Sequence, residues 1–580
     1  MPSLRKINRK LEKVFGGRVR ALSEDGCLCL EGELDNWDDL VRAGIMALDR
    51  RRPLVNRITF TPGIPSMELP PVEDTLLDGE RPDVLVIGGG VTGCAAAREL
   101  ARHDLKILLV EKEHDLAMHA SSRNDGMVHP GLDLRKGSAK YRYNKRGNAA
   151  YDRICGELGV PFRRTGQYLC FSKRAFIPIL YLSLVYWKWL GVPGARLVLK
   201  KELHRLEPGL GEDLAAALFF PTAGVVCPYG LTIAYGENAV ENGVKLSLDT
   251  AVLGMDTGGG RIASVKTNRG TIYPGVVINA AGVFAEDIAA MAGDRFYSIH
   301  PRRGTNSILD KKYTLIRTIA SKMFAGPRRR SGETERGEAG GSAHTKGGGM
   351  IRTVHGNLLV GPDAVETPER ENFATQADSI AVTFAKFRET CPALSEGQVI
   401  ASFTGIRAPT YEEDFVVSRG RKTANLVHAA GIQSPGLTAA PAIAEDLARF
   451  AVEILNAAGR SVGPNRAFNP FRKPIPHTAA LDEEARHELI QCNPDYGVIL
   501  CRCEEVSRGE ILDALRRPVP CDTLDGVKRR VRPGGGRCQG AFCGPLVLQL
   551  IAAEKGIPLE AVTKNGAGSE LLLGEVKGDL

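Results

Sequence analysis

The chain has 580 residues, enough for several domains, and its 43% hydrophobic and 25% charged residues are typical of a globular protein with a large core. The net charge of +8 is modest for this length and excludes the strongly basic composition of a nucleic-acid-binding protein. The charged N-terminal sequence shows no apolar secretory segment, so we expect a cytoplasmic protein whose 13 cysteines are reduced thiols or metal ligands rather than disulfides.

Residues 1–75 predict a small α/β module whose role the sequence does not reveal. Cys27 and Cys29 alternate along a strand and would share one face of it, and without a second cysteine pair nearby we interpret them as packing residues. The elements expected after this strand are a helix over 37–48, a strand over 56–60 and a proline-rich linker over 61–71.

The next stretch predicts a β–α–β unit that binds a dinucleotide. Residues 83–87, which are apolar after Asp83, indicate a buried parallel strand, and Gly88, Gly90 and Gly93 fit the pattern G-x-G-x-x-G. In this pattern the first glycine allows a tight turn, the second lets the backbone approach a pyrophosphate, and the third lets the helix pack on the strand. Glu111 ends the following strand, 18 residues after Gly93, where a carboxylate can accept a hydrogen bond from a ribose hydroxyl. The alternative is a glycine-rich turn without a ligand.

Residues 120–131 combine small and polar residues with two glycines, which would let the backbone lie close to a ligand. The alternative is an ordinary surface loop. The segment resembles the S-x-x-N-S/H-G-x-x-H-x-G stretch of FAD-dependent glycerol-3-phosphate dehydrogenases and L-2-hydroxyglutarate dehydrogenases, which lies along the flavin in those enzymes. The resemblance implies that the FAD contacts include Ser122, Arg123, Asn124 and Gly126.

Further motifs extend this resemblance over residues 83–455. An apolar strand runs into a glycine turn at Gly282 and is similar to the strand that returns to the FAD in this superfamily. Residues 425–441 match the last FAD motif, in which a helix N-terminus points at the flavin pyrimidine ring, and they imply FAD contacts at Gly431, Gly436 and Leu437. Segments that match substrate-side motifs lie at 217–229, 353–362 and 405–408.

The fold class implied is α/β, with a Rossmann-like FAD-binding domain interleaved with a mixed β-sheet substrate domain over residues 76–460. One segment departs from the family pattern. Where the family has a short link, residues 326–349 are rich in glycine, arginine and glutamate, which indicates a flexible insertion whose role is open.

The resemblance also implies the reaction, which is oxidation of a small anionic secondary alcohol, either glycerol 3-phosphate or a 2-hydroxy acid such as 2-hydroxyglutarate, by hydride transfer to flavin N5. Arg407 is the expected cation for the substrate's phosphate or carboxylate, because a guanidinium binds either group through two hydrogen bonds. A neutral histidine suits the base that takes the hydroxyl proton, and His129 and His355 are the candidates. For both histidines a packing role is an equal alternative. Arg302 and Arg303 are second-line anion contacts or surface residues.

Residues 176–190 form the longest apolar stretch of the chain, and they hold two of its three tryptophans. The stretch is too short to span a membrane and is interrupted by Pro178 and Lys188. It predicts a buried or dimer-contact helix; the alternatives are a peripheral anchor on a membrane surface and a docking surface for another subunit.

Four cysteines near the C-terminus predict a metal centre. Cys501 and Cys503 are followed by Cys538 and Cys543, and thiolates at this spacing suit zinc or an iron–sulfur cluster. After a linker over 461–490, residues 491–580 resemble the small helical bacterioferritin-associated-ferredoxin-like domain that is appended to large subunits of anaerobic glycerol-3-phosphate dehydrogenases. The resemblance implies a 2Fe–2S cluster on these four cysteines. The basic run that precedes the second pair, residues 528–537, would offset the charge of the cluster or form a solvated face.

FAD and a 2Fe–2S cluster in one chain imply that electrons leave through the cluster to a partner subunit, and we expect an oligomer. Two other functions fit the same fold. One is an amine or amino-acid oxidase, which would release ammonia. The other is a non-catalytic flavin and iron–sulfur subunit of an electron-transfer complex, whose flavin no small substrate would reduce.

Overall fold

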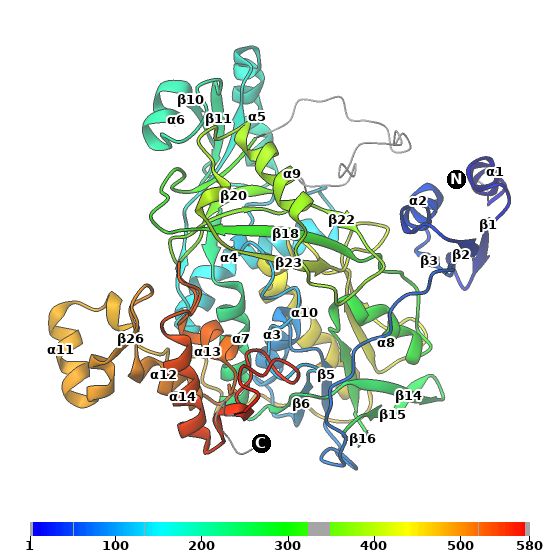
Figure 1. The fold of residues 1–580 in the computed structure, drawn as a ribbon. Coiled ribbons are helices and arrows are strands. Elements are labelled where there is room, and N and C mark those ends of the chain that lie inside the picture. The colour runs from blue at the N-terminus through cyan, green and yellow to red at the C-terminus, as the bar shows by residue number, and fades with distance from the viewer. Residues whose placement is uncertain (1–3, 50, 133, 323–347, 520, 575–580) are drawn as a thin grey trace.

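The computed structural model describes residues 4–49, 51–132, 134–322, 348–519 and 521–574 (Figure 1). Most of the expected insertion at 326–349 therefore lies outside the described residues. Within them, no helix combines the length and the apolar composition needed to cross a bilayer.

The N-terminal module packs α1 (Leu4–Phe15) and α2 (Trp37–Ala47) on a small sheet. The helix expected over 37–48 is confirmed, whereas the strand expected over 56–60 is two short strands that both run parallel to β2. The sheet consists of β1 (Val19–Glu24), β2 (Cys27–Leu34), β3 (Leu54–Asn56) and β4 (Thr59–Phe60).

This module contacts the loop that follows the substrate-domain strand β23 (Val399–Arg407). Tyr411 from that loop belongs to the core of the module, and its hydroxyl accepts a hydrogen bond of 2.8 Å from Asn56 Nδ2. Glu412 accepts one of 2.7 Å from the backbone of Leu54. The N-terminal module thus helps to hold the loop that follows Arg407.

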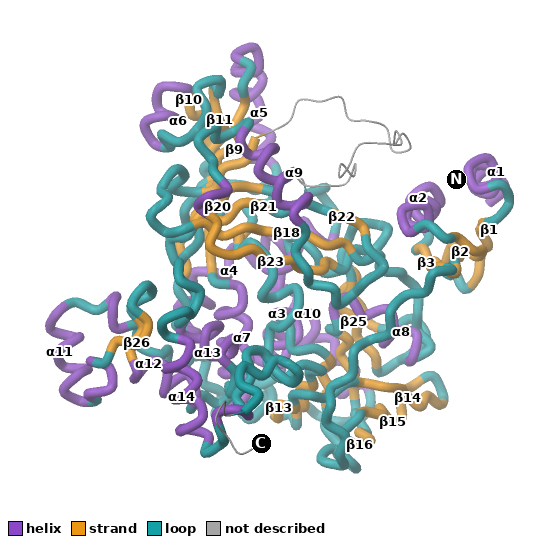
Figure 2. The backbone as a smooth tube through the Cα atoms, in the orientation of Figure 1, coloured by secondary structure: helices purple, strands orange, loops and turns teal. Residues whose placement is uncertain are grey.

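The nucleotide domain is a twisted sheet covered by helices, as Figure 2 shows. Apolar four-residue strands in its centre are buried on both faces, as expected of parallel strands. The strand order is β13 (Lys245–Ser247), β6 (Ile107–Val110), β5 (Val84–Ile87), β17 (Val276–Asn279), β25 (Leu426–Ala430) and β24 (Val416–Arg419), and only β24 is antiparallel to its neighbour.

Helices α3 (Val91–Leu100), α4 (Ala139–Leu158), α7 (Pro228–Glu241) and α10 (Gly436–Ala457) pack together, and their small buried residues join the core of this sheet. The remaining parts of this unit are α8 (Ala285–Met291), the antiparallel sheet β14 (Val252–Gly258), β15 (Arg261–Thr267) and β16 (Gly270–Ile272), and the small sheet β7 (Met127–Val128), β12 (Gly224–Val226) and β8 (Phe162–Arg163).

The substrate domain is a mixed sheet above the nucleotide domain in Figure 1. Its strand order is β10 (Arg196–Leu199), β11 (Ala216–Phe220), β9 (Gln167–Phe171), β19 (Ile319–Lys322), β20 (Gly349–Arg352), β21 (Leu358–Gly361), β18 (Arg302–Leu309) and β22 (Val365–Glu366), and β23 also pairs with β18. Helices α5 (Ile177–Trp189), α6 (Lys200–Leu206) and α9 (Ala377–Arg388) flank it.

The C-terminal domain is mostly helical. It contains α11 (Glu483–Cys492), the hairpin β26 (Ile499–Cys501) and β27 (Val506–Ser507), and α12 (Arg508–Leu515), α13 (Leu524–Val531) and α14 (Gly544–Lys555). A capping box between Ser507 and Glu510 fixes the start of α12.

Candidate active site and metal centre

The glycine turn after β5 has the geometry of a phosphate-binding loop. Gly88 has φ +108°, and a Cβ there would lie 2.5 Å from the carbonyl oxygen of Ala280 in the turn after β17. A Cβ on Gly93 would lie 1.9 Å from the carbonyl oxygen of Gly88, so helix and turn pack with no space between them. A Cβ on Gly90 would meet only Ser121 Oγ, at 3.1 Å. Of these three glycines, only Gly90 has open space beside it. A pyrophosphate could approach the N-terminus of α3 there.

Glu111 follows β6 and joins the two ends of this β–α–β unit. Its carboxylate accepts hydrogen bonds from the backbone of Gly89, at 2.5 Å, and of Glu113, at 3.0 Å. Burial raises the pKa of Glu111, and these backbone donors oppose the shift. The carboxylate therefore lies beside the glycine turn, as a ribose contact requires.

The segment that resembles the flavin-lining stretch folds on its own polar side chains. Ser122 Oγ donates to the carbonyl of His119, Asn124 Nδ2 donates to the carbonyl of Ala120, and Gly126 N donates to Asn124 Oδ1. These bonds fold the segment into a series of tight turns. They bring it against β23, because a Cβ on Gly405 would lie 2.3 Å from the carbonyl oxygen of Arg123.

The same segment ends at the N-terminus of α10. The backbone N–H of His129 donates to Thr438 Oγ1 at 2.8 Å, and His129 Nε2 lies 3.3 Å from Ser434 Oγ. Gly436 and Leu437 form the first turn of α10, and Gly431 and Gly282 have φ +68° and +58° in the turns after β25 and β17. The expected FAD contacts from five separate segments thus surround one region at the ends of parallel strands, the usual ligand position in this type of sheet.

Arg407, the expected anion site, lies at the end of β23, within two residues of Gly405 and the flavin-lining segment. Its Nη2 donates to the backbone carbonyl of Asp363 at 2.7 Å, and Gly304 on β18 leaves room for the guanidinium. No carboxylate of the described residues lies within ion-pair distance of it. Burial and the nearby Arg302 lower the pKa of Arg407, and the carboxylates of Asp363, Asp125 and Glu366, which lie beyond ion-pair distance, oppose this shift.

The two second-line arginines, Arg302 and Arg303, already have side-chain partners within the protein. Arg302 is buried and pairs with Glu366 and Glu413, at 2.5 and 2.8 Å. Arg303 points to the other side of β18, where it donates to Gln376. These partners were not evident from the sequence, because they lie more than 60 residues away. Of the three arginines, only Arg302 has carboxylate partners among the described residues; Arg303 donates to an amide, and Arg407, beside the flavin-lining segment, donates to a backbone carbonyl.

His355 lies at the opposite end of the substrate sheet from Arg407, in the turn between β20 and β21. Arg302 pairs with Arg407 at one end of β18, and Leu309 pairs with Leu358 at the other, seven residues or about 23 Å away. Burial and the charges of Arg532 and Lys311 hold the pKa of His355 well below its ordinary value. The structure therefore separates His355 from Arg407 and places His355 against the C-terminal domain.

The four C-terminal cysteines converge. Cys503 Sγ lies 3.8 Å from both Cys501 Sγ and Cys538 Sγ, and Cys543 forms a hydrogen bond with Cys501 that lowers the pKa of the Cys501 thiol. These distances exceed a disulfide bond, and they match two sulfurs bound at about 2.3 Å to one tetrahedral metal. Four soft thiolate donors fit an iron–sulfur cluster. Cys492 is exposed, and Cys521 is buried as a free thiol.

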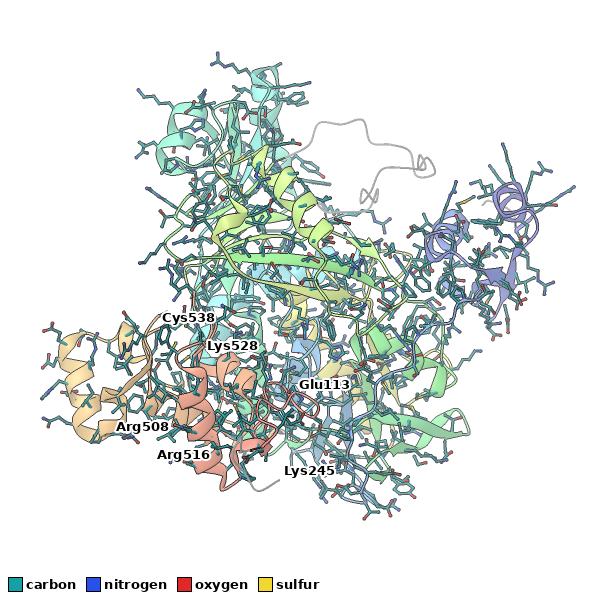
Figure 3. The ribbon with its side chains drawn as sticks, viewed as in Figure 1. Glu113, Lys245, Arg508, Arg516, Lys528 and Cys538 are labelled. Carbon is teal, nitrogen blue, oxygen red and sulfur yellow. The ribbon has the colours of Figure 1, made fainter. Side chains whose placement is uncertain are left out.

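The sequence allowed two roles for the basic run before the second cysteine pair, a solvated face or a counter-charge for the cluster. The run is not a solvated face, and it does more than offset the charge of the cluster. It attaches the C-terminal domain to the rest of the protein. Its arginines pair with carboxylates far away in the sequence: Arg529 and Arg530 with Asp115, Arg532 with Glu504, and Arg537 with Asp310. Arg532 also donates to Tyr229, and Cys538 consequently lies next to the substrate sheet (Figure 3).

An Asp115→Asn substitution is expected to destabilise this attachment by about 3 kcal/mol, because it leaves buried arginine charge poorly compensated. Burial would raise the pKa of Asp115, but Arg530 and Arg529 outweigh it and lower the pKa to about 2. Stability from this carboxylate is therefore full above its unfolded pKa of about 4 and is lost as the pH falls towards 2, by about 2 kcal/mol.

Thermal unfolding of Asp115→Asn and of the unmodified protein between pH 3 and pH 7 measures both effects. The difference in stability between the two proteins should be largest at about pH 7. Asp25→Asn is the matched control, because Asp25 forms an exposed pair with Lys422. A variant as stable as the control at neutral pH would contradict the role of Asp115.

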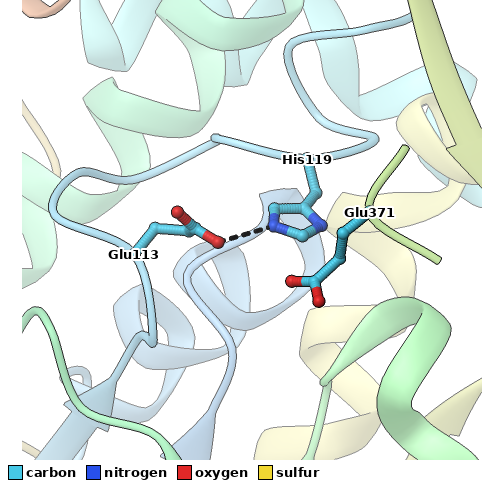
Figure 4. Close-up of side chains that lie close together, drawn as sticks. All are labelled: Glu113, His119 and Glu371. Atoms are coloured by element: carbon cyan, nitrogen blue, oxygen red, sulfur yellow. Dashed lines mark hydrogen bonds and ion pairs between the residues drawn. The ribbon is translucent and has the colours of Figure 1, made fainter. Parts of the chain in front are cut away.

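Glu113, His119 and Glu371 form a further cluster near the nucleotide site (Figure 4). His119 Nε2 lies 2.8 Å from Glu113 Oε1. Lys112 Nζ lies 2.5 Å from a carboxylate oxygen of each glutamate. The lysine already supplies the cation between the two carboxylates, so the cluster is an ion-pair network that holds the loop after β6.

The fold and the two sites define a class of protein: an oxidoreductase with a dinucleotide cofactor and a separate thiolate centre. Comparison with known proteins identifies the family. Residues 83–450 match the family described as FAD dependent oxidoreductase, and residues 499–553 match the BFD-like 2Fe-2S binding domain. The chain belongs to the FAD dependent oxidoreductase family, and the expected fold class and the two cofactors, FAD and a 2Fe–2S cluster, are confirmed.

Three relatives are informative. A protein of Caloramator mitchellensis named glycerol 3-phosphate dehydrogenase is 35% identical over 86% of this chain and 99% of its own length. Anaerobic glycerol-3-phosphate dehydrogenase subunit A1 of Haloferax volcanii is 25% identical over 80% of this chain and 81% of its own length. The solved structure of L-alpha-glycerophosphate oxidase from Mycoplasma pneumoniae with FAD bound has a TM-score of 0.59 and 25% identity, over 68% of this chain and 98% of that one.

Proposed function

We propose that this protein is a glycerol-3-phosphate dehydrogenase, and that its electrons leave through the 2Fe–2S cluster to a partner subunit. The observation that carries the proposal is Arg407, a cation without a carboxylate partner among the described residues, beside the flavin-lining segment. Such a cation is costly unless an anion joins it, and the substrate's phosphate would supply that anion. The names of the relatives support glycerol 3-phosphate over a 2-hydroxy acid.

The residues around Arg407 have separate roles in this proposal. Arg407 binds and orients the phosphate through its planar fork. Glu366 and Glu413 pair with Arg302, which leaves Arg407 as the arginine available to the phosphate. His129 accepts the hydroxyl proton, and its contact with Ser434 orients the imidazole. When bound, FAD accepts the hydride from the carbinol carbon.

The expected FAD contacts and domain limits are part of the same proposal. Gly88, Gly90 and the start of α3 would hold the pyrophosphate, and Glu111 the ribose. Domain limits of 1–75, 76–460, 461–490 and 491–580 are supported by the family matches over 83–450 and 499–553. Cys501, Cys503, Cys538 and Cys543 would be the cluster ligands. The Haloferax relative is named a subunit, which supports an electron-accepting partner.

Anaerobic bleaching of the flavin tests the substrate. We expect glycerol 3-phosphate to bleach it faster than 2-hydroxyglutarate, lactate or amino acids at equal concentration. Bleaching by an amino acid with release of ammonia would instead show an amino-acid oxidase. Failure of the whole panel would indicate a non-catalytic electron-transfer subunit.

In the same assay, Arg407→Lys is expected to weaken glycerol 3-phosphate binding and slow flavin reduction, by about 2 kcal/mol or about 30-fold in total, because lysine keeps the charge but loses the fork. Arg303→Lys is the matched control, since Arg303 lies on the other side of β18 with Gln376. Equal kinetics for the two variants would place the anion site elsewhere.

A further inference from the structure

Helix α5 exposes an apolar surface at the tip of the substrate domain. Only Leu180 among its residues is buried, whereas Val185 is 72% exposed, Leu182 69% and Tyr181 66%. Ile179, Tyr186 and Trp189 are also more than half exposed. The prediction for residues 176–190 was a buried or dimer-contact helix, and burial is wrong for the single chain. A dimer contact and the two alternatives, a docking surface for another subunit and a membrane anchor, all need an exposed helix.

The inner face of α5 is well anchored. Leu180, Leu184 and Trp187 pack on a core cluster that includes Phe171 and Phe220, and Trp187 meets Phe220 edge-on at 5.1 Å. The exposed residues are thus not a consequence of a loosely attached helix. A helix that is apolar on all sides needs a second apolar environment for its outer face.

The position of α5 leaves that face accessible. In Figure 1, α5 lies with β10 and α6 at the top of the molecule, away from the C-terminal domain and the N-terminal module. The helix has 13 residues and is about 20 Å long, which is too short to span a bilayer and long enough to lie along its surface.

The charge on and next to α5 that has no ion-pair partner among the described residues is positive. Residues 158–201 contain eight basic residues and no aspartate or glutamate, and three of the eight, Arg164, Arg196 and Lys200, pair with acidic residues outside this range. Lys173, Arg174 and Lys188 are exposed next to or within the helix, and they form no ion pair among the described residues. Lys136 lies over the ring of Trp189, at 3.4 Å from its centroid. A binding partner that complements this surface would therefore be apolar opposite α5 and negatively charged around it.

We propose that α5 lies on the surface of an anionic phospholipid bilayer. Its apolar side chains would enter the boundary between headgroups and acyl chains, where tryptophan and tyrosine are favoured, and its basic neighbours would contact lipid phosphates. A second copy of this chain fits less well, because two such surfaces would bring basic residues together without acidic partners. This inference goes beyond the proposed reaction and needs no catalytic activity to be tested.

Sedimentation of the full-length holoprotein with sucrose-loaded vesicles tests the proposal. We expect binding to vesicles of phosphatidylcholine mixed with phosphatidylglycerol, weaker binding to phosphatidylcholine alone, and a decrease at high salt. The double variant Leu182→Asp/Val185→Asp should lower the partition coefficient at least about tenfold, since it removes two inserted side chains and adds negative charge.

The matched control is Ile64→Asp/Leu69→Asp, which makes the same change at two exposed apolar residues of the 61–71 linker. It should bind vesicles as the unmodified protein does. Flavin content and melting temperature should be equal in both variants, which shows that any loss of binding is not unfolding. Arg174→Glu/Lys188→Glu should weaken binding to the anionic vesicles alone.

The proposal would be overturned by an unmodified protein that stays in the supernatant with both kinds of vesicle, or by an α5 variant that binds as well as the control. It would also be overturned if the α5 variant changed the oligomeric state by light scattering while vesicle binding was absent throughout. That result would assign the apolar surface to a second copy.

Discussion

A Gly90→Val variant is expected to fold but to purify without flavin. Gly90 has φ −76° and ψ 176°, which valine adopts readily, and its only close neighbour is the rotatable hydroxyl of Ser121. The valine methyl groups would occupy the open side of the turn and keep a pyrophosphate from the N-terminal N–H groups of α3. Each lost charge-assisted hydrogen bond costs about 1.5–3 kcal/mol, so several together should abolish binding of FAD.

Absorbance at the flavin bands, relative to protein, measures this effect, and circular dichroism shows whether the fold persists. Gly254→Val is the matched control, because Gly254 lies in β14 with no atom within 4 Å of the added Cβ. Gly93→Val should behave differently from both and fail to fold, since its Cβ would lie 1.9 Å from a backbone oxygen. A yellow Gly90→Val protein with a normal flavin spectrum would contradict the position of the pyrophosphate.

A Cys538→Ser variant is expected to lose most of its bound iron and sulfide while it keeps its flavin. Cys538 Sγ lies 3.8 Å from Cys503 Sγ, and a serine hydroxyl is a harder and less readily ionised ligand than a thiol. The FAD region is formed by other elements, so the flavin content and its bleaching by glycerol 3-phosphate in a single turnover should remain. Since a 2Fe–2S cluster passes electrons one at a time, sustained turnover with a protein acceptor should fall sharply.

Iron and sulfide analysis, together with the electron paramagnetic resonance signal of the reduced protein, reports on the cluster independently of activity. Cys492→Ser is the control, because Cys492 is exposed in the same domain and away from the four converging thiols. Native protein that contained zinc and no iron would refute the cluster assignment. Normal turnover of the iron-poor variant with its physiological partner would instead make the cluster structural.

The sequence alone was sufficient for the parts of the protein that depend on local chemistry. Gly88 has a positive φ and Gly93 packs on the carbonyl of Gly88, two local constraints that lie within six residues, so the pattern of Gly88, Gly90 and Gly93 could be recognised directly. The two cysteine pairs could also be recognised from the sequence, because a metal centre constrains residue type and spacing more than it constrains the surrounding fold. Both signals indicate the family and the cofactors from the sequence alone.

The tertiary structure decided everything that depends on which distant segments meet. The pairing of β18 with β21 and β23 separates His355 from Arg407, although both belong to substrate-side motifs. The basic run at 528–537 pairs with carboxylates up to about 415 residues away, the most distant of which is Asp115. No local sequence pattern can predict pairs at this separation.

The same is true of the two surfaces whose roles were left open. The N-terminal module contacts the loop at Tyr411, and α5 presents its apolar residues to solvent. An apolar helix has the same sequence whether it is covered or exposed, because burial is a property of its neighbours. Composition could therefore predict that residues 176–190 form an apolar helix, and only the packing of the substrate domain could show that no described residue covers its outer face.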